Sequence, residues 1–592
     1  MIRKAIILLL CFACIHFHPA PAYAQSEPPE PPRVFLDTAY AQAAGIKIIV
    51  GAREDFQSAL NVGHLGDEII LTAGVTKPGN FTLPAKSGTA PLIIRTSNLD
   101  ALEEGRRVGP ADATNMPKLV SPNSDPVILA APGAHHYRFV GIEFSSRVDM
   151  NNLIALGDGS ETDVSRAPSD LTIDRCYAHG LANLKLRRGI ALNSARTAII
   201  DSYISEVHEV GADSQAICGW NGPGPFKIVN NYLESAGENV MFGGADPKIQ
   251  GLVPSDIELR RNKFFKPLSW NPFDKENFQP LSGQAVTWTT NSQPCASEEQ
   301  GRRLPPRYVA AGGCTARHWS VKNLLELKNA QRVLIEGNLF ENNWADAQSG
   351  YAILFKSVNQ DGAAAWCITQ DVDCKNNIVR RSPGGVNVLG FDASQPGQKA
   401  RRVSVRNNLF DDIAGSFLQI SDAPDVSADH NTILHGGNVI TAYGPASPGF
   451  TYTNNLSRHN AFGVKGDSQG TGLPTLNAYF TGYAFTKNVL AGGNSSLYPP
   501  DNYFPASLDS VGFVDAASGN YRLSSSSVYR NAGTDGRDLG ADIDAIEAAM
   551  RGVVVPPPVP PSVNLTVPPE GIDIEYRDVR TGRVILTVRL RP

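Results

Sequence analysis

A short segment recurs through most of the chain, and it constrains the fold more than any other feature. Each copy begins with alternating apolar and polar residues. Asn, alone or with a second Asn or an Asp before it, follows, and then come one or two apolar residues. Examples are FKIVNNYLESAG from Phe226 and RRVSVRNNLFDD from Arg401. Copies follow one another at intervals of about 25 to 30 residues, a period typical of stacked supersecondary units. The repeat therefore predicts a solenoid rather than several separate globules.

Asparagine recurs at one point of the motif. Asn tolerates left-handed backbone geometry, and its side-chain amide can bond to the same amide one coil away. Unrelated turns in a β-sandwich would not place Asn at the same point of each copy. We therefore expect an asparagine ladder at a sharp turn of each coil, drawn from Asn230, Asn231, Asn262, Asn338, Asn376, Asn377, Asn407, Asn408, Asn431, Asn454, Asn455 and Asn488.

Both ends of the repeat carry segments that would close it. Helical spacing over 53–62 precedes the strand-like GDEIILTAG and predicts a helix that covers the open first coil. Irregular closing strands follow from Phe513, and a short helix is expected near Asp542 to Met550. The predicted organisation is a signal peptide (1–24), a leader (25–52), a solenoid (53–545) with a loop insertion (267–317), a helix end and Pro-rich linker (546–562) and a C-terminal β-hairpin (563–592).

The first residues are typical of a secretory signal peptide. A basic start is followed by an apolar run from Ala5 to Phe17 and by the small-residue site Ala22-Tyr23-Ala24, which predicts cleavage after Ala24. No later segment predicts a membrane span. We therefore expect an exported, soluble, monomeric protein that does not insert into a membrane.

The composition agrees with a turn-rich β protein. The 592 residues include 54 Gly and 42 Pro, which disfavours helical bundles and coiled coils. Loss of Arg3 and Lys4 with the signal takes the formal charge from −5 to −7. A nucleic-acid partner is not expected, and a polyanion would have to bind at a local basic cluster.

Six cysteines remain after removal of the signal peptide. In an oxidising compartment the close pairs Cys295/Cys314 and Cys367/Cys374 are candidates for loop disulfides. The other two, Cys176 and Cys218, lie in strand-like runs and could equally be buried thiols. No CxxC pattern or Cys/His cluster indicates a structural zinc site.

This repeat resembles the right-handed parallel β-helix of secreted pectate-lyase-like proteins, over roughly residues 53 to 545. The resemblance implies an all-β solenoid. It does not select an activity, because that fold carries lyases, hydrolases, epimerases and adhesins.

A second strand in each coil offers candidate chemistry. If its large apolar residues fill the interior, their neighbours point outward, with adjacent coils about 4.8 Å apart. This alignment predicts two neighbouring outward columns, one of Trp220, Gly243, Lys328 and Lys356 and one of Cys218, Met241, Glu326 and Leu354. Two adjacent ammonium groups would lower the pKa of one lysine, which could then act as a base. The two glycines after Phe242, Gly243 and Gly244, would leave space for a sugar ring.

The pattern suits β-elimination on a uronic-acid polysaccharide, which needs a neutralised carboxylate and a base for the C5 proton. The strand NLLELKNA is similar to the lysine-bearing strand of the β-helical lyase family of chondroitinase B and alginate lyases. The resemblance implies Lys328 as the base and places Lys356 where that family has an arginine. It also makes calcium a candidate cofactor, with ligands mapping to Glu326 and, as helpers, Glu238 and Asn239.

The insertion before this strand predicts a lid or cleft wall. Its tryptophans and arginines, with the residues that lead into the strand, could stack on sugars and bind carboxylates. The candidate substrate-binding residues are Glu238, Asn239, Asp246, Trp220, Arg317, His318 and Trp319.

Three alternatives remain open from the sequence. Paired carboxylates chosen from Glu238, Asp246 and Glu326 would suit a glycoside hydrolase on the same fold. A surface protein that binds glycans without catalysis would need no such pair. Finally, Lys328 and Lys356 could be a solvated pair with Glu326 as ion-pair partner, and each Trp of the insertion could be a packing anchor.

Overall fold

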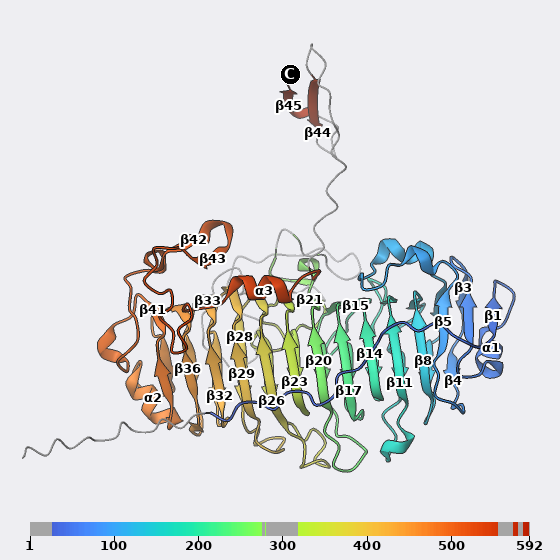
Figure 1. Ribbon diagram of the computed structural model, residues 1–592, viewed down its shortest axis with the longest axis horizontal. Coiled ribbons are helices and arrows are strands. Elements are labelled where there is room, and N and C mark those ends of the chain that lie inside the picture. Colours follow the sequence, from blue (N-terminus) through green and yellow to red (C-terminus); the bar gives the residue numbers. More distant parts are fainter. Residues whose placement is uncertain are drawn as a thin grey trace, which may run out of the picture. The chain divides into compact units, whose positions relative to one another are not determined.

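The computed structural model describes residues 26–274, 277, 279 and 318–553, together with the strands at 572–577 and 584–590. Three long parallel sheets stack strand upon strand, and each coil of the chain contributes one strand to each sheet in turn (Figure 1). The protein is therefore a right-handed parallel β-helix, as the repeat predicts. The predicted signal peptide and most of the 267–317 insertion lie outside the described residues.

Sheet 1 has fourteen strands. In order they are β1 (Lys47–Val50), β2 (Glu68–Leu71), β5 (Leu92–Thr96), β8 (His135–Val140), β11 (Ser169–Asp174), β14 (Ala195–Ile200), β17 (Gly224–Val229), β20 (Ser255–Arg260), β23 (Ala330–Glu336), β26 (Thr369–Lys375), β29 (Arg401–Arg406), β32 (Val426–Asp429), β36 (Thr451–Thr453) and β40 (Ala484–Thr486).

Sheet 2 has thirteen strands. They are β3 (Thr76–Pro78), β6 (Lys118–Ser121), β9 (Glu143–Ser146), β12 (Tyr177–His179), β15 (Tyr203–Val207), β18 (Tyr232–Ser235), β21 (Lys263–Phe265), β24 (Leu339–Glu341), β27 (Ile378–Ser382), β30 (Leu409–Ile413), β33 (Thr432–His435), β37 (Leu456–Arg458) and β41 (Val489–Ala491).

Sheet 3, which carries the candidate site, has twelve strands. They are β4 (Phe81–Leu83), β7 (Ile128–Ala130), β10 (Met150–Leu156), β13 (Leu186–Leu192), β16 (Gln215–Gly219), β19 (Glu238–Phe242), β22 (Leu325–Leu327), β25 (Tyr351–Lys356), β28 (Gly384–Leu389), β31 (Leu418–Ser421), β34 (Ile440–Ala442) and β38 (Val464–Gly466).

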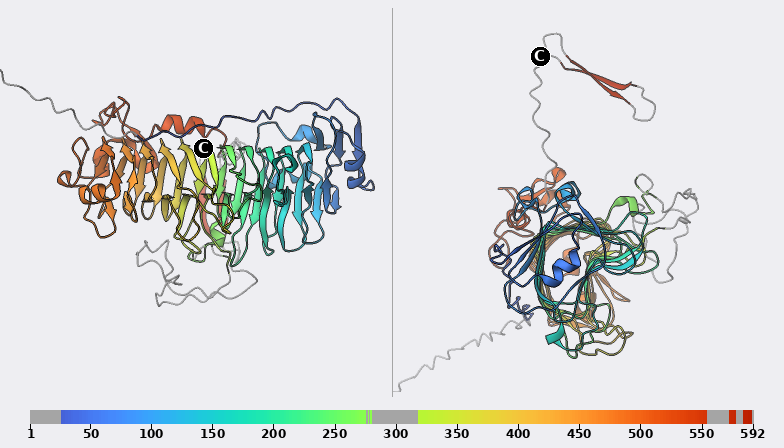
Figure 2. Two further views of the ribbon diagram at one scale, coloured as in Figure 1. Left: turned by 90° about the horizontal axis from the view of Figure 1, so that it is seen from below. Right: turned by 90° about the vertical axis from the view of Figure 1, so that its right-hand side faces the viewer.

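One continuous apolar core fills the coils, and large side chains such as Phe139, Phe242 and Phe355 are almost fully buried in it. Helix α1 (Phe56–Val62) covers the open first coil, as predicted. Its N-cap Asp55 accepts a hydrogen bond from the Ser58 amide, and Phe56 and Leu60 enter the core. In the end-on view of Figure 2 this helix lies across the mouth of the coils. It therefore shields apolar side chains of the first coil from water.

The predicted asparagine ladder runs between sheets 1 and 2. Each ladder amide donates to the Oδ1 of the next coil's asparagine at 2.9–3.2 Å. The ladder residues are Asn231, Asn262, Asn338, Asn377, Asn408, Asn431, Asn455, Asn488 and Asn502.

The left-handed residue at this turn is the one before each ladder asparagine. Asn230, Asn376, Asn407 and Asn454 have φ of 50–58°, so they make the sharp turn while their neighbours form the ladder. The two roles that the sequence assigns to asparagine thus belong to adjacent residues.

The last coils are closed by two short parallel strands, β35 (Ser447–Pro448) and β39 (Phe480–Thr481), and helix α2 (Leu473–Tyr479). An antiparallel pair follows, β42 (Phe513–Asp515) with β43 (Asn520–Leu523), and helix α3 (Ile543–Ala549) packs on sheet 2 through Ile543 and Ile546. A separate unit, residues 554–592, contains the antiparallel strands β44 (Ile572–Arg577) and β45 (Val584–Leu590). Their antiparallel pairing is the one that a hairpin would have.

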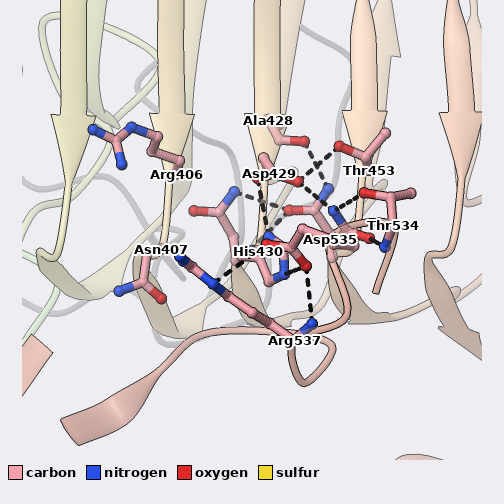
Figure 3. Close-up of polar contacts among 12 residues, drawn as sticks. Arg406, Asn407, Ala428, Asp429, His430, Thr453, Thr534, Asp535 and Arg537 are labelled. Carbon is pink, nitrogen blue, oxygen red and sulfur yellow. Dashed lines mark hydrogen bonds and ion pairs between the residues drawn. The ribbon is translucent and has the colours of Figure 1, made fainter. Parts of the chain in front are cut away.

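Polar contacts join the segment around Thr534 and Asp535, which we call the closing segment, to the coils (Figure 3). His430 lies between two carboxylates, with Nδ1 2.9 Å from Asp429 and Nε2 3.5 Å from Asp535. Asn454 donates to the Asp429 carboxylate at 2.8 Å and accepts from the Thr534 amide at 2.8 Å. The closing segment is therefore fixed to the turn that carries the ladder.

The cysteines correct one prediction. Cys367 and Cys374 are both free, so the disulfide predicted between them is wrong. Cys374 points from β26 into the apolar core, whereas Cys367 lies in the preceding loop. Cys176 and Cys218 are buried free thiols, the second of the two options that the sequence left open. Cys295 and Cys314 lie outside the described residues.

Candidate active site

The outer face of sheet 3 brings the two predicted columns together. Strand pairing aligns Cys218 with Met241, Met241 with Glu326 and Glu326 with Leu354. The same register sets Lys328 beside Gly243 and Lys356 beside Lys328, one coil apart. This part of the site was predictable because the apolar residues fix the register of neighbouring coils.

Glu326 lies between the two lysines. Its Oε1 is 3.5 Å from the Lys328 Nζ and 4.0 Å from the Lys356 Nζ. The Glu326 side chain is fully buried, while the side chains of Lys328 and Lys356 are 8% and 17% exposed. A second carboxylate, Asp392, lies 3.8 Å from Lys356. The cluster therefore presents its ammonium groups to solvent and keeps its central acid behind them.

The predicted fall in lysine pKa is wrong for Lys328. Burial alone would lower its pKa, but the nearby carboxylates of Glu326 and Glu238 outweigh burial and raise it above the ordinary lysine value. The prediction treated the two ammonium groups as an uncompensated pair, whereas Glu326 is their ion-pair partner, as one of the alternatives left open by the sequence has it. Lys328 is therefore held as a permanent cation.

Glu238 forms the second buried acid of the site, on strand β19. Its Oε2 accepts a hydrogen bond from Gln215 at 2.8 Å, and its Oε1 lies 4.0 Å from the Lys322 ammonium, which itself pairs with Asp213 at 2.5 Å. Burial raises the pKa of Glu238, and Asp213 and Glu326 add to this, so the protonated form is favoured. The two buried glutamates on adjacent coils therefore differ in their neighbours. Glu326 faces two ammonium groups, whereas burial and nearby carboxylates dominate around Glu238.

Several acceptors in this cluster lack hydrogen bonds within the described part of the chain. They are one oxygen each of Glu238, Glu326 and Gln215, all nearly inaccessible to solvent. Buried polar atoms in folded proteins are almost always hydrogen-bonded, so such groups often lie where a ligand or water acts. The cluster is therefore a better candidate for function than a solvated ion pair.

The glycine pair after Phe242 does not provide the predicted space. A Cβ at Gly243 would come within 2.8 Å of the Lys328 Cβ, and one at Gly244 within 2.5 Å of the Met241 Cε. The neighbouring coil and the Met241 side chain already fill these positions. Any sugar ring would have to bind beside the lysines rather than over the glycines.

Arg188 is a candidate that the sequence analysis missed. It lies on β13 in line with Gln215 and Glu238, and its guanidinium stacks over the Trp220 ring at 4.9 Å. Its Nε has no hydrogen-bond partner in the described structure. The predicted columns begin at Cys218 and Trp220, one coil later than Arg188. Extending the column of Gln215 and Glu238 back by one coil would have found it.

Two other predicted residues, Asn239 and Asp246, bind backbone groups. Asn239 is buried, and its amide donates to the carbonyls of Leu233 and Phe265 at 2.6 and 2.9 Å. Asp246 accepts from the Ala363 amide at 2.7 Å, which ties two loops together. We therefore assign both residues to holding backbone in place.

The segment leading into β22 gives a similar result. Trp319 is buried and stacks on His208 at 3.8 Å between ring centroids, which is a packing role. His318 pairs with Asp346 at 3.1 Å. Arg317 lies outside the described residues, with most of the predicted lid.

Calcium does not fit this site. The predicted ligand Glu326 faces two ammonium groups within 4.0 Å, and a dication there would meet like charge. The described residues contain no group of three His, Cys, Asp or Glu side chains that could hold a metal ion. The second predicted helper, Asn239, is engaged with backbone carbonyls.

Comparisons with known proteins give likeness of structure alone. No protein-family model matches the chain, and no curated protein matches it. Among solved structures, it is similar to the catalytic unit of a GH87 α-1,3-glucanase from Streptomyces thermodiastaticus strain HF3-3, with a TM-score of 0.45 and 12% identity over 80% of this chain and 72% of that one.

Two lyase structures are also similar to this chain. A mannuronic acid specific polysaccharide family 6 lyase from human gut microbiota gives a TM-score of 0.40 and 11% identity over 78% of this chain and 93% of that one. An alginate lyase from Paenibacillus sp. str. FPU-7 gives a TM-score of 0.27 and 12% identity over 74% and 98%. With TM-scores below 0.5 and identities of 11–12%, these similarities carry no conclusion about activity.

Proposed function

We propose that the protein is a carbohydrate-active enzyme that cleaves a uronic-acid polysaccharide by β-elimination on the outer face of sheet 3. The observation that carries this proposal is the order of exposure in the cluster. The lysines form its solvent-facing end, while Glu326 and Glu238 are fully buried behind them. An anionic glycan can therefore meet the ammonium groups first.

The geometry supports roles opposite to those implied by the resemblance. Lys328 keeps its charge because Glu326 and Glu238 raise its pKa, so it suits the task of neutralising the substrate carboxylate. Lys356 is the more exposed amine, and its contacts with Glu326 and Asp392, at 4.0 and 3.8 Å, are longer than hydrogen bonds.

In the proposed step, the Lys356 amine acts as the base, its own proton having passed to solvent water. The C5 proton of the uronate moves to the Lys356 amine, and the electrons of that C–H bond form the C4=C5 double bond. The glycosidic oxygen leaves from C4 and takes a proton from water or a neighbouring acid. Atoms and charge balance without a metal ion.

A glycoside hydrolase is the second candidate. It is favoured by Glu238, whose raised pKa favours a protonated carboxyl group one coil from Glu326, because such enzymes use a protonated acid near a second carboxyl group. Its weakness is access, because both carboxyl groups are closed to solvent. A glycan-binding protein without catalysis is the third.

The test is incubation of the protein with a panel of uronic-acid polysaccharides. Elimination yields an unsaturated uronate that absorbs in the ultraviolet, hydrolysis yields reducing ends without that absorbance, and a binder yields neither. We expect ultraviolet absorbance from at least one polysaccharide. Reducing ends without absorbance would replace the lyase proposal by the hydrolase.

The matched variants are Lys356→Ala and Lys375→Ala. Lys375 pairs with Glu336 and Asp373 on sheet 1 and is similarly half-buried. Removing the base should lower the rate at least about 100-fold, while Lys375→Ala should keep full activity. Equal activities would refute the assignment of Lys356.

We also propose export to the periplasm or beyond. The support is the signal-like start of the sequence. No helix in the described part of the chain is long and apolar enough to cross a membrane. N-terminal sequencing of the mature protein should begin at Gln25, and a start at Met1 would refute cleavage.

A further inference from the structure

The segment that follows the predicted signal peptide lies along the outer face of sheet 1. Residues 26–40, which we name the strap, run from the last coils toward the first, across the strands of sheet 1 (Figure 1). The Ser26 hydroxyl lies 3.4 Å from that of Thr451, and the Ala39 carbonyl accepts from Arg138 at 3.1 Å. One short segment thus contacts coils that are far apart in the sequence.

The first half of the strap has an unusual sequence, Glu-Pro-Pro-Glu-Pro-Pro-Arg over residues 27–33. Proline has no amide hydrogen, so only Glu27, Glu30 and Arg33 can donate from the backbone. All three donate to aspartates of sheet 1. The acceptors are the Oδ1 atoms of Asp425, Asp371 and Asp256, at 3.3, 3.1 and 2.9 Å.

Those aspartates belong to one row that runs across the coils. Strand pairing aligns Asp256, Arg332, Asp371, Arg402 and Asp425, so acid and base alternate from coil to coil. Arg332 donates to Asp256 at 2.7 and 3.1 Å, and Arg402 donates to Asp371 at 2.6 and 2.8 Å. We name these five residues the Asp/Arg row.

The spacing of the row matches the spacing of the strap. Aspartates recur at every second coil, which is about 9.6 Å at the usual separation of strands. A polyproline II chain has three residues per turn and rises about 3.1 Å per residue, so its amides at every third position recur at about 9.3 Å. Each turn of the strap therefore advances by two coils.

We propose that the Asp/Arg row is a binding site for a polyproline II chain with one amide hydrogen at every third residue, filled here by the chain's own Glu-Pro-Pro repeat. The arginine forks fix the Asp256 and Asp371 side chains, and Oδ1 of each accepts both the arginine Nε and the strap amide. The strap then holds β20 to β32 at a common spacing. Those coils also carry Lys328 and Lys356, although the proposal does not depend on their function.

The electrostatics of the row agree with this geometry. Burial raises the pKa of Asp371, but Arg402 and the Glu30 amide lower it more, and the pKa of Asp256 is lowered in the same way by Arg332 and Arg33. Both side chains are thus ionised acceptors at neutral pH. Further along the strap, Lys227 donates to the Leu36 carbonyl at 3.1 Å and fixes the register of the segment.

Two deletions in the full chain test the match of periods. Removing Pro32 leaves only Pro31 between Glu30 and Arg33. The distance from the Glu30 amide to the Arg33 amide is then two residue lengths, at most about 7 Å, which is too short to span two coils. Removing Glu30, Pro31 and Pro32 together deletes more of the chain but keeps the three-residue period. The Glu27 amide then takes the place opposite Asp371.

The measurement is amide hydrogen exchange of the peptide that covers the strap. In the wild-type protein we expect the three amides to exchange at least tenfold more slowly than in a free peptide. Deletion of Pro32 should release at least one of them, whereas the triplet deletion should keep both remaining amides protected. Free exchange in the wild type, or full protection after loss of Pro32, would overturn the proposal.

A pair of variants on one strand gives the second test. Asp371→Ala removes the acceptor of the Glu30 amide and should accelerate its exchange at least tenfold. Asp373 lies on the same strand as Asp371, and its side chain pairs with Arg406 rather than with the strap. The control variant is Asp373→Ala. It should leave the strap protected, and equal effects of the two variants would refute a specific site.

Discussion

Sheets 1 and 3 bury charge in different ways on the same coils. On sheet 1, Asp256 and Asp371 each bind an arginine fork and a strap amide. On sheet 3, Glu326 and Glu238 are buried more deeply, yet each keeps an oxygen without a hydrogen bond among the described residues. A satisfied row stabilises a structure, whereas an unsatisfied cluster costs stability and is retained where a ligand can use it.

The largest expected effect comes from the acid between the two lysines. Glu326→Gln leaves Lys328 and Lys356 as neighbouring, partly buried ammonium groups without their shared counter-charge. Removing one partner of a buried ion pair costs about 3–5 kcal/mol. Denaturant unfolding should show this loss.

The control for Glu326→Gln is Asp373→Asn on sheet 1. Asp373 pairs with Arg406 and Lys375 near the surface, and such exposed pairs contribute at most about 1 kcal/mol. If both variants lose the same stability, the contrast between the two faces is wrong.

The fold was predictable in detail because its signal is periodic. The positions of Asn377 and Lys328 follow from a repeat in which every coil has the same inward pattern, so neighbouring strands can align in only one register. The environment of Lys328 did not follow, because strand register places a Cβ and says nothing of where Glu326 directs its carboxylate. The strap was equally hidden, since Glu30 binds Asp371, a residue 341 positions away.

Replacing an asparagine of the ladder, where the side-chain amides are hydrogen-bonded, should cause an intermediate loss in the free energy of unfolding. The Asn377 amide donates to Ile335 and Asn408, and its oxygen accepts from Asn338. Asn377→Ala leaves these buried partners unpaired and should cost about 2–4 kcal/mol in the free energy of unfolding.

The matched variant for the ladder is Asn376→Gly. It keeps the left-handed backbone, where φ is 57°, and removes only the half-buried outer amide. Its loss should stay below about 1 kcal/mol. A loss as large as that of Asn377→Ala would mean that the turn, and not the ladder, stabilises the coil.

The effect expected at Glu238 differs from the others in kind, because it depends on pH. Burial, Asp213 and Glu326 raise the pKa of Glu238 above the ordinary glutamate value of 4.5. The folded protein therefore keeps a proton that the unfolded chain releases above that value. The stability from this group is full below the unfolded pKa and is lost as pH rises through the folded one.

Glu238→Gln should remove that dependence, because the amide is neutral at every pH. The difference in unfolding free energy between variant and wild type should grow in favour of the variant from pH about 5 to about 9, by at most about 1.4 kcal/mol per pH unit. Burial lowers the pKa of Lys266 and the Glu238 carboxylate raises it, so the difference reports the titration of both groups. A constant difference across that range would mean that Glu238 is ionised in the fold. The protonated acid that a hydrolase needs would then be absent, while Lys328 and Lys356 would remain as candidates for the lyase.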